Sequence, residues 1–234
     1  MRVERFIAEQ VSDICVCHIG DRVAAYGYLA YLLLGSESGI MNAARGLMAS
    51  TASCQPMEYL DETRLAQVAL EAVAALARRG GTAGFEVERE RLLGHGGFDP
   101  FENSISPSEV TYLAFDRERL VIALKETYAA NGYMCPYVTP LPLCPGHIGV
   151  ELDFMRYCLE RVAGGEPGYL RIASRFFGSH LKEWGVLFAV VLREKATHPA
   201  LTYLSYALDK FIACETITFR QSLPSLCVQR LLTD

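Results

Sequence analysis

The sequence predicts an all-α fold, a single helical domain of roughly ten helices. Apolar residues recur at three- and four-residue spacing along most of the 234 residues, and runs that alternate between apolar and polar residues are few. A chain of this length buries a sizeable core without disulfide bonds or metal ions. Hydrophobic residues make up 51% of the chain and charged residues 21%, a composition that excludes an intrinsically disordered protein.

Helices in the first half are separated by polar and glycine-rich breaks. Asp21 is placed to cap a helix that is apolar nearly all round, which is typical of a central, buried helix. Asp61 is placed to cap a second helix, and Gly80-Gly81 are placed to end that helix. Helices are predicted over residues 6–15, 23–33 and 65–76. A turn is predicted at 94–101. After it, the capping box Ser106-Pro107-Ser108-Glu109 is predicted to begin another helix.

An uncharged loop divides the second half. A helix is predicted from Asp116 through Tyr128, and Asn131-Gly132 end it. Residues 127–150 carry no Asp, Glu, Lys or Arg, but their four prolines exclude a membrane-spanning helix. We therefore predict a hinge loop, 132–146, between an N-terminal helical part, 1–131, and a C-terminal one, 147–234. Later helices are predicted over 147–162, up to Gly164-Gly165, and from about Leu170, Trp184 and Pro199.

Charge and cysteine usage narrow the class of protein. The formal net charge is -5, which argues against a protein that binds nucleic acid independently of its sequence. The eight cysteines are scattered, and several lie in apolar helical patterns. The charged start Met1-Arg2-Val3-Glu4-Arg5 is not that of a secretory signal peptide. These features predict a cytoplasmic protein with reduced thiols, no structural metal and no membrane insertion.

Two blocks of the sequence carry a family resemblance. The first runs from Pro100-Phe101-Glu102-Asn103-Ser104 to Cys144-Pro145-Gly146-His147-Ile148-Gly149-Val150-Glu151-Leu152-Asp153-Phe154-Met155. The second is Phe176-Phe177-Gly178-Ser179-His180-Leu181-Lys182-Glu183-Trp184, which continues to Glu215. Over about residues 26–215 the chain resembles the TorD/DmsD family of redox-enzyme maturation chaperones. Where that family has Pro-Asp-His before a Glu-Leu-x-Phe-Met helix, this chain has Pro145-Gly146-His147 and lacks the acidic residue.

The resemblance implies a function and a set of partners. It implies an all-helical cytoplasmic chaperone, not an enzyme, that binds the twin-arginine signal peptide or the apoprotein of a molybdopterin-containing oxidoreductase. Such a chaperone assists molybdopterin insertion before the enzyme is exported, and needs no cofactor of its own. The identity of the client enzyme, nucleotide binding and the formation of a homodimer stay open.

A signal-peptide binder needs an apolar groove and negative charge for the arginine pair. Residues 85–120 carry eight acidic residues against four arginines, a pattern that a solvated surface also explains. The uncharged loop supplies apolar surface beside the family motif. We predict a peptide-binding groove near this loop, formed by Phe101, Glu102, Leu143, Pro145, His147, Glu151 and Asp153. The two glutamates and the aspartate of this set are predicted to face the arginines of the signal peptide.

Other interpretations of the same residues stay open. His147 is either a peptide-binding residue or a structural helix cap. His180 and Trp184 are spaced as neighbours on one face of one helix, where a structural role is favoured. Cys135, Cys144 and His147 are candidate metal ligands, although no paired C-x-x-C zinc spacing is present. The alternative functions are therefore a helical scaffold or subunit, and a metal- or thiol-dependent enzyme.

Overall fold

The computed structural model describes residues 19–35, 40, 42–43, 83–94, 104–113, 116–137 and 143–231, with side chains as far as Arg220. These residues form eight α-helices and no strand, so the predicted all-α class is confirmed. The helices predicted over 6–15 and 65–76 lie outside the described residues. The described helices are α2 (Ile19–Leu34), α5 (Ala83–Leu93), α6 (Glu109–Tyr112), α7 (Arg117–Ala130), α8 (Ile148–Ala163), α9 (Gly168–Ser179), α10 (Leu181–Lys195) and α11 (Pro199–Leu231).

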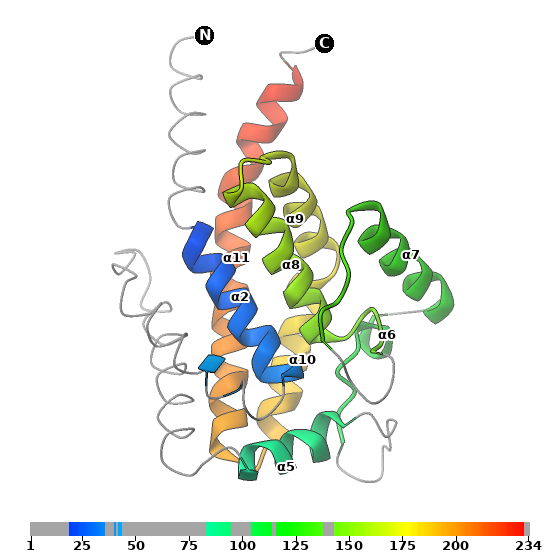
Figure 1. Ribbon diagram of the computed structural model, residues 1–234, viewed down its shortest axis with the longest axis vertical. Coiled ribbons are helices and arrows are strands. Elements are labelled where there is room, and N and C mark those ends of the chain that lie inside the picture. The colour runs from blue at the N-terminus through cyan, green and yellow to red at the C-terminus, as the bar shows by residue number, and fades with distance from the viewer. Residues whose placement is uncertain are drawn as a thin grey trace.

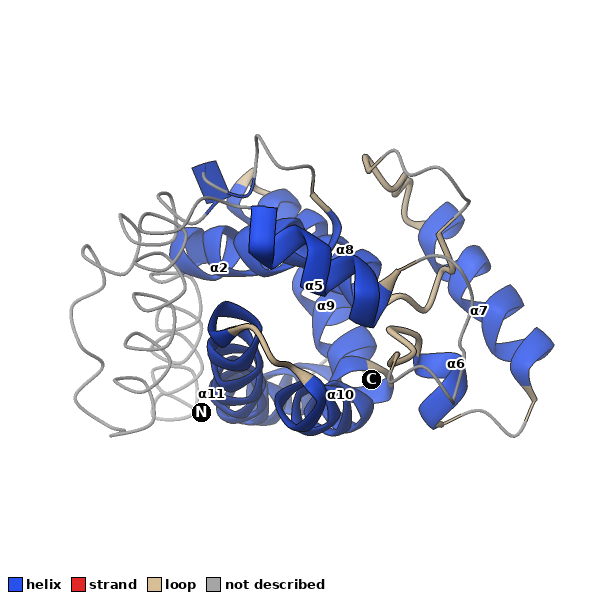
Figure 2. Ribbon diagram, turned by 90° about the horizontal axis from the view of Figure 1, so that it is seen from below, coloured by secondary structure: helices blue, strands red, loops and turns tan. Residues whose placement is uncertain are grey.

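Helix α8 lies at the centre of the bundle. Helices α2 and α9 pack along it, and α10 packs on α8, α9 and α11 (Figure 1). The first two turns of α8 are buried on every side, from Ile148 through Met155. Because α2 packs on α8, the helical parts on either side of the predicted hinge loop share one core. Helices α6 and α7 lie to one side of this bundle (Figure 2).

Several predicted helix boundaries are confirmed. The carboxylate of Asp116 accepts the backbone N–H of Arg119 at 3.0 Å and so caps the start of α7. Asn131-Gly132 end α7, and Gly164-Gly165 end α8. The second residue of each pair, Gly132 or Gly165, adopts a positive φ, 69° and 93° respectively, which glycine adopts without steric cost. Local chemistry is sufficient to fix these boundaries.

The predicted capping box at residues 106–109 is wrong. Helix α6 has only four residues, and Ser108 before it has an extended backbone and makes no side-chain cap bond. The cause is a contact with the start of α8. The N–H of Glu109 donates to the carbonyl of Gly146 at 2.8 Å, and Ser108 pairs with His147 in an antiparallel bridge. This tertiary pairing takes the place of a local cap.

Helices α9 and α10 follow α8, as the predicted starts near Leu170 and Trp184 require, but the prediction that His180 and Trp184 lie on one helix is wrong. Helix α9 ends at Ser179, α10 begins at Leu181, and His180 between them has φ -125° and ψ -87°. Its Nδ1 lies 2.9 Å from the Glu109 carboxylate of α6, and its ring lies against Phe176 at 4.6 Å. His180 and Trp184 therefore do not share a helix, because a bond to another segment holds His180 at the junction.

Helix α5 is an element that the sequence pattern does not indicate. It lies across one end of the bundle and packs on α11 (Figure 1). Phe85 and Leu92 are buried, and so is Glu88. The carboxylate of Glu88 accepts hydrogen bonds from Arg91 and from the backbone and hydroxyl of Thr197, and these bonds lower its pKa to about 2. At least this acidic residue ties α5 to the segment between α10 and α11 and is not part of a solvated surface.

Among the described helices, none combines the length and the apolar character that crossing a bilayer requires.

Candidate functional site

A cleft of about 720 Å³ lies between α2, α8 and the segment that follows α7. We call it the tyrosine cleft, because three half-buried tyrosines line it together with a proline and a charged pair. These residues come from three parts of the chain: Tyr28 and Tyr31 on α2, Pro136 and Tyr137 after α7, and Asp153 and Arg156 on α8. The volume is typical of a site that holds a small molecule or a few residues of a peptide.

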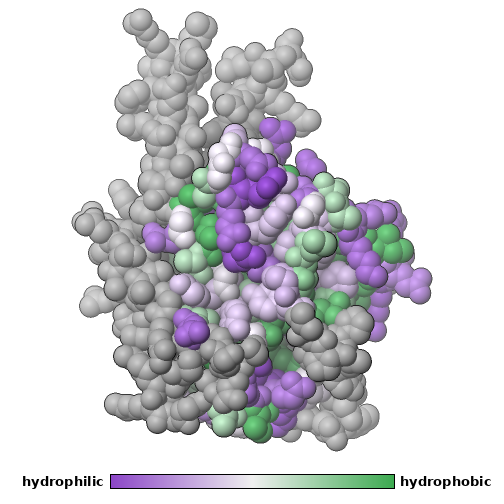
Figure 3. Space-filling model, viewed as in Figure 1, coloured by the Kyte–Doolittle hydropathy of each residue, from purple (hydrophilic) through white to green (hydrophobic). Residues whose placement is uncertain are grey.

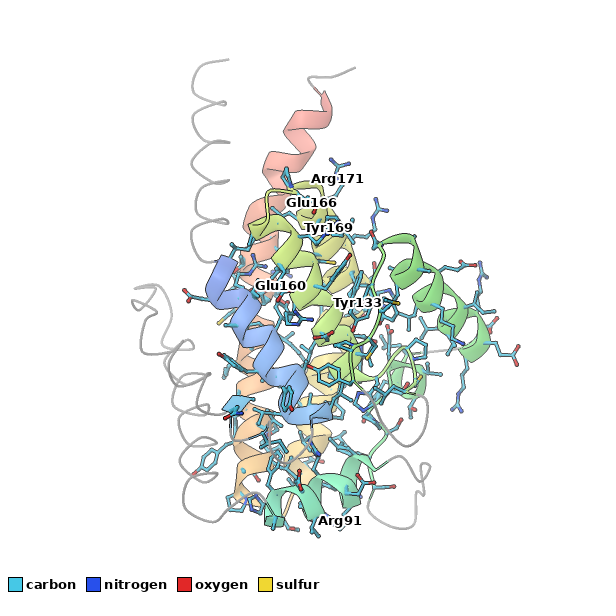
Figure 4. The ribbon with its side chains drawn as sticks, in the orientation of Figure 1. Arg91, Tyr133, Glu160, Glu166, Tyr169 and Arg171 are labelled. Atoms are coloured by element: carbon cyan, nitrogen blue, oxygen red, sulfur yellow. The ribbon has the colours of Figure 1, made fainter. Side chains whose placement is uncertain are left out.

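The floor of the tyrosine cleft carries charged side chains from α8. Asp153 is fully buried, and it accepts Arg156 Nε at 2.7 Å and the Tyr133 hydroxyl at 2.8 Å. Arg156 Nη1 donates to Glu160 at 2.5 Å. Figure 4 shows Tyr133 in the segment beside α8 and Glu160 further along α8. Asp153 and Arg156 line the cleft and offset each other's charge, and Glu160, which is exposed and lies outside the lining, leaves this face of α8 with one excess negative charge.

A glycine on α2 makes room for this arrangement. A Cβ atom added at Gly27 would lie 2.9 Å from Cδ of Arg156, closer than side chains pack. The aliphatic part of Arg156 therefore passes close to α2 at a position without a side chain. From there the guanidinium reaches both Asp153 and Glu160.

The walls of the tyrosine cleft are aromatic. The rings of Tyr31 and Tyr137 meet edge to face, with centroids 6.0 Å apart and planes at 65°. Burial, and then the negative charge of Asp153, raises the pKa of Tyr137, so its hydroxyl stays a hydrogen-bond donor. Aromatic faces suit apolar side chains and cationic groups such as guanidinium. On the face shown in Figure 3, strongly hydrophilic residues gather towards the upper end, and paler residues lie below them.

The motif segment Pro145-Gly146-His147 lies on another side of α8. His147 Nδ1 accepts the backbone N–H of Gly149 at 3.0 Å, so His147 is the cap of α8. The carbonyl of Pro145 accepts the Tyr128 hydroxyl at 2.8 Å. Leu143 is half-buried and packs against the core. These contacts fix the start of α8 against α6 and α7.

Glu151 is enclosed at the same side of α8. It is fully buried, and Trp184 Nε1 donates to its Oε2 at 2.9 Å. Glu109 of α6, itself buried, contacts Glu151 and bonds to His180. We call Glu109, Glu151, His180 and Trp184 the carboxyl cluster.

The predicted site residues are thus divided between two places. Asp153 lines the tyrosine cleft, and Glu151 belongs to the carboxyl cluster. Successive residues of an α-helix are rotated by about 100°, so residues two apart leave α8 on different sides. None of the predicted Leu143, Pro145 and His147 is among the described residues that line the cleft. The predicted Phe101 and Glu102 lie outside the described residues.

The cysteines in the described part are Cys135, Cys144, Cys158 and Cys214, all free thiols. Burial raises the pKa of Cys158 to about 12 and also raises that of Cys135, so both stay protonated at neutral pH. No group of three or more His, Cys, Asp or Glu side chains in that part is placed to hold a metal ion. Neither of these two thiols has the low pKa of a nucleophile.

The residues that sequence reasoning missed are Tyr28, Tyr31, Tyr137 and Arg156. The tyrosines at 28 and 31 are one helical turn apart, a spacing that places both on one face of α2. Nothing in the sequence indicates that Tyr137 meets this face. Comparison of the chain with models of protein families, with curated proteins and with solved structures found no match.

Proposed function

We propose that this chain is a TorD-like maturation chaperone of the cytoplasm. It binds the twin-arginine signal peptide, or the apoprotein, of a molybdopterin-containing oxidoreductase and assists cofactor insertion before export. The observation that supports this most is the tyrosine cleft, an aromatic site with the Asp153–Arg156 pair at its floor and the exposed Glu160 beside it, next to the segment that joins α7 to α8. The chain acts by binding and performs no chemical step.

The tyrosine cleft supplies both kinds of contact that a signal peptide requires. Tyr28, Tyr31 and Tyr137 offer ring faces to a guanidinium group or to apolar side chains. Glu160, exposed beside the cleft, supplies the excess negative charge, because Asp153 is paired with Arg156 and accepts the Tyr133 hydroxyl. The arginines of the peptide therefore bind mainly to the ring faces and to the field of Glu160, and less by a direct pair with Asp153.

The position of the missing acid of the family motif lies next to Glu109 of α6. A Cβ atom added at Gly146 would lie 3.2 Å from Leu124 Cδ1 and 3.5 Å from Glu109 Cβ. A larger side chain at 146 has little room, and the side chain of Glu109 lies where it would begin. The Glu109 side chain thus begins beside the position at which the family carries its acid, and its carboxylate turns into the carboxyl cluster.

Titration calorimetry with a twin-arginine leader peptide from a molybdopterin oxidoreductase encoded nearby tests this function. We expect the native leader to bind, and binding to weaken at least about tenfold when both arginines are replaced by alanine, because a desolvated cation contact is worth about 1–2 kcal/mol. Affinity for the native leader should also fall as salt concentration rises. A leader that does not bind, or that binds equally well without its arginines, would contradict the signal-peptide function. If the apoprotein also fails to bind, the helical-scaffold alternative gains instead.

A further inference from the structure

Two buried carboxyl groups meet between α6 and α8 and have few donors around them. Glu109 is 2% exposed and Glu151 is fully enclosed, and their carboxyl groups are in contact. Trp184 donates to Oε2 of Glu151, but no N–H or O–H of the described residues reaches its Oε1. Both oxygens of Glu109 lie 2.9–3.0 Å from His180 Nδ1.

Among the described residues, other polar groups near this pair bond elsewhere. Tyr128 of α7 donates its hydroxyl to the carbonyl of Pro145, and Cys144 shares a hydrogen bond with the Ser108 hydroxyl at 3.3 Å. His147, the cap of α8, uses Nδ1 as an acceptor. In the described part of the chain no lysine or arginine pairs with either carboxyl group, and His180 is the basic side chain bonded to the pair.

Two ionised carboxylates in contact inside the protein repel each other strongly, and one histidine offsets only one of the two charges. A proton between them removes the repulsion and gives Oε1 of Glu151 the hydrogen bond that it otherwise lacks. Burial, and then the negative charge of Glu109, raises the pKa of Glu151 well above its ordinary value, in agreement with this geometry.

We propose that Glu109 and Glu151 share one proton, and that this proton fastens the segment 104–113 onto the start of α8 as a pH-dependent latch. The same segment is joined to α8 by the bond from the N–H of Ile148 to the carbonyl of Pro107, at 2.8 Å, and by the bond from Glu109 to Gly146. When the proton leaves, two carboxylates face each other and the contact between α6 and α8 opens. The latch does not depend on the function proposed above.

The direction of the pH effect follows from where the proton is bound. The folded protein holds it at pH values at which the unfolded chain has released it, so the contribution of the pair to stability falls as pH rises above the ordinary carboxyl range. Glu151→Gln replaces the proton with a permanent amide donor of nearly the same shape. This variant should therefore keep the latch closed at alkaline pH.

Hydrogen exchange of the full-length protein tests the latch. We expect protection of the Glu109 amide, corrected for intrinsic exchange, to fall at least about tenfold between about pH 6 and about pH 9, with a much smaller fall in Glu151→Gln. His180 is present in both proteins, so the difference between them isolates the shared proton. Glu118→Gln, an exposed change on α7, is the control and should behave as wild type.

Infrared spectroscopy gives a second readout that needs no comparison of stability. At neutral pH the wild-type protein should show the carbonyl stretch of a buried protonated carboxyl group, and Glu151→Gln should lack it. Protection that does not change with pH, or that changes equally in wild type and Glu151→Gln, would overturn the proposal. So would the absence of a protonated carboxyl band from the wild-type protein, even if the variant does not fold.

Discussion

Replacing Glu215 with alanine is expected to lower the free energy of unfolding by about 3–5 kcal/mol, because it breaks a buried ion pair. Arg22 of α2 donates through Nε and Nη2 to the two oxygens of Glu215 of α11, each at 2.8 Å. The Tyr26 hydroxyl donates to the same carboxylate at 2.8 Å. The two charged side chains are only 9% and 3% exposed. The variant leaves the guanidinium buried without this carboxylate.

Urea denaturation of three variants measures this effect. Glu215→Ala should lose the most stability, and the double variant Arg22→Met/Glu215→Leu should lose much less, because it removes both charges and keeps the packing. Asp209→Ala is the matched control: it removes a partly exposed pair with Arg193 at 3.8 Å and should cost less than about 1 kcal/mol. A loss below about 1 kcal/mol for Glu215→Ala would show that the pair does not hold α2 to α11.

Replacing Tyr31 and Tyr137 together with alanine is expected to weaken leader binding by about 100-fold. Their rings are in contact on the wall of the tyrosine cleft, and the loss of two aromatic contacts of about 1.4 kcal/mol each gives this factor. Both side chains are half-buried, so the protein should stay folded. Calorimetric titration with the native leader, after a check of the helical circular dichroism signal, measures the change.

Two matched variants show whether ring faces and position matter. Tyr31→Phe/Tyr137→Phe keeps both rings and should bind within about threefold of wild type, because the π face and not the hydroxyl makes the contact. Tyr203→Ala/Tyr206→Ala removes two exposed tyrosines of α11 and should not change binding. Equal affinity in the Tyr31/Tyr137 alanine variant and in wild type would place the leader elsewhere on the protein.

The helices that the sequence predicts well are those whose ends depend on local chemistry. Asp116 and Gly132 bound α7, and Gly165 lies just after α8, where the pattern places them. The errors occur where a distant residue decides the structure. The break at His180 depends on a bond to Glu109, 71 positions away in the chain. Glu88 of α5 is held by Thr197, 109 positions away. A one-dimensional pattern carries no information on such contacts.

The site could be predicted only in part for the same reason. The sequence brings Asp153 to the correct neighbourhood, beside the segment after α7, because the loop and the start of α8 are close along the chain. It gives no sign that Glu151 faces α6 and α10 instead. The tyrosines of α2 have the spacing of buried core residues, and only the folded chain brings Tyr137 against Tyr31, 106 positions earlier. Their role as a wall therefore depends on long-range packing.

Site-specific photo-crosslinking tests the central claim, that a leader peptide binds in the tyrosine cleft, most directly. Benzoylphenylalanine placed at Tyr31 of the full-length protein should capture a labelled twin-arginine leader on illumination. Excess unlabelled leader should abolish the crosslink, and a leader with both arginines replaced by alanine should give much less of it. The same photoreactive residue at Tyr203 on α11 should capture little. A leader that binds in calorimetry but is not captured from position 31, or is captured equally from position 203, would contradict the claim.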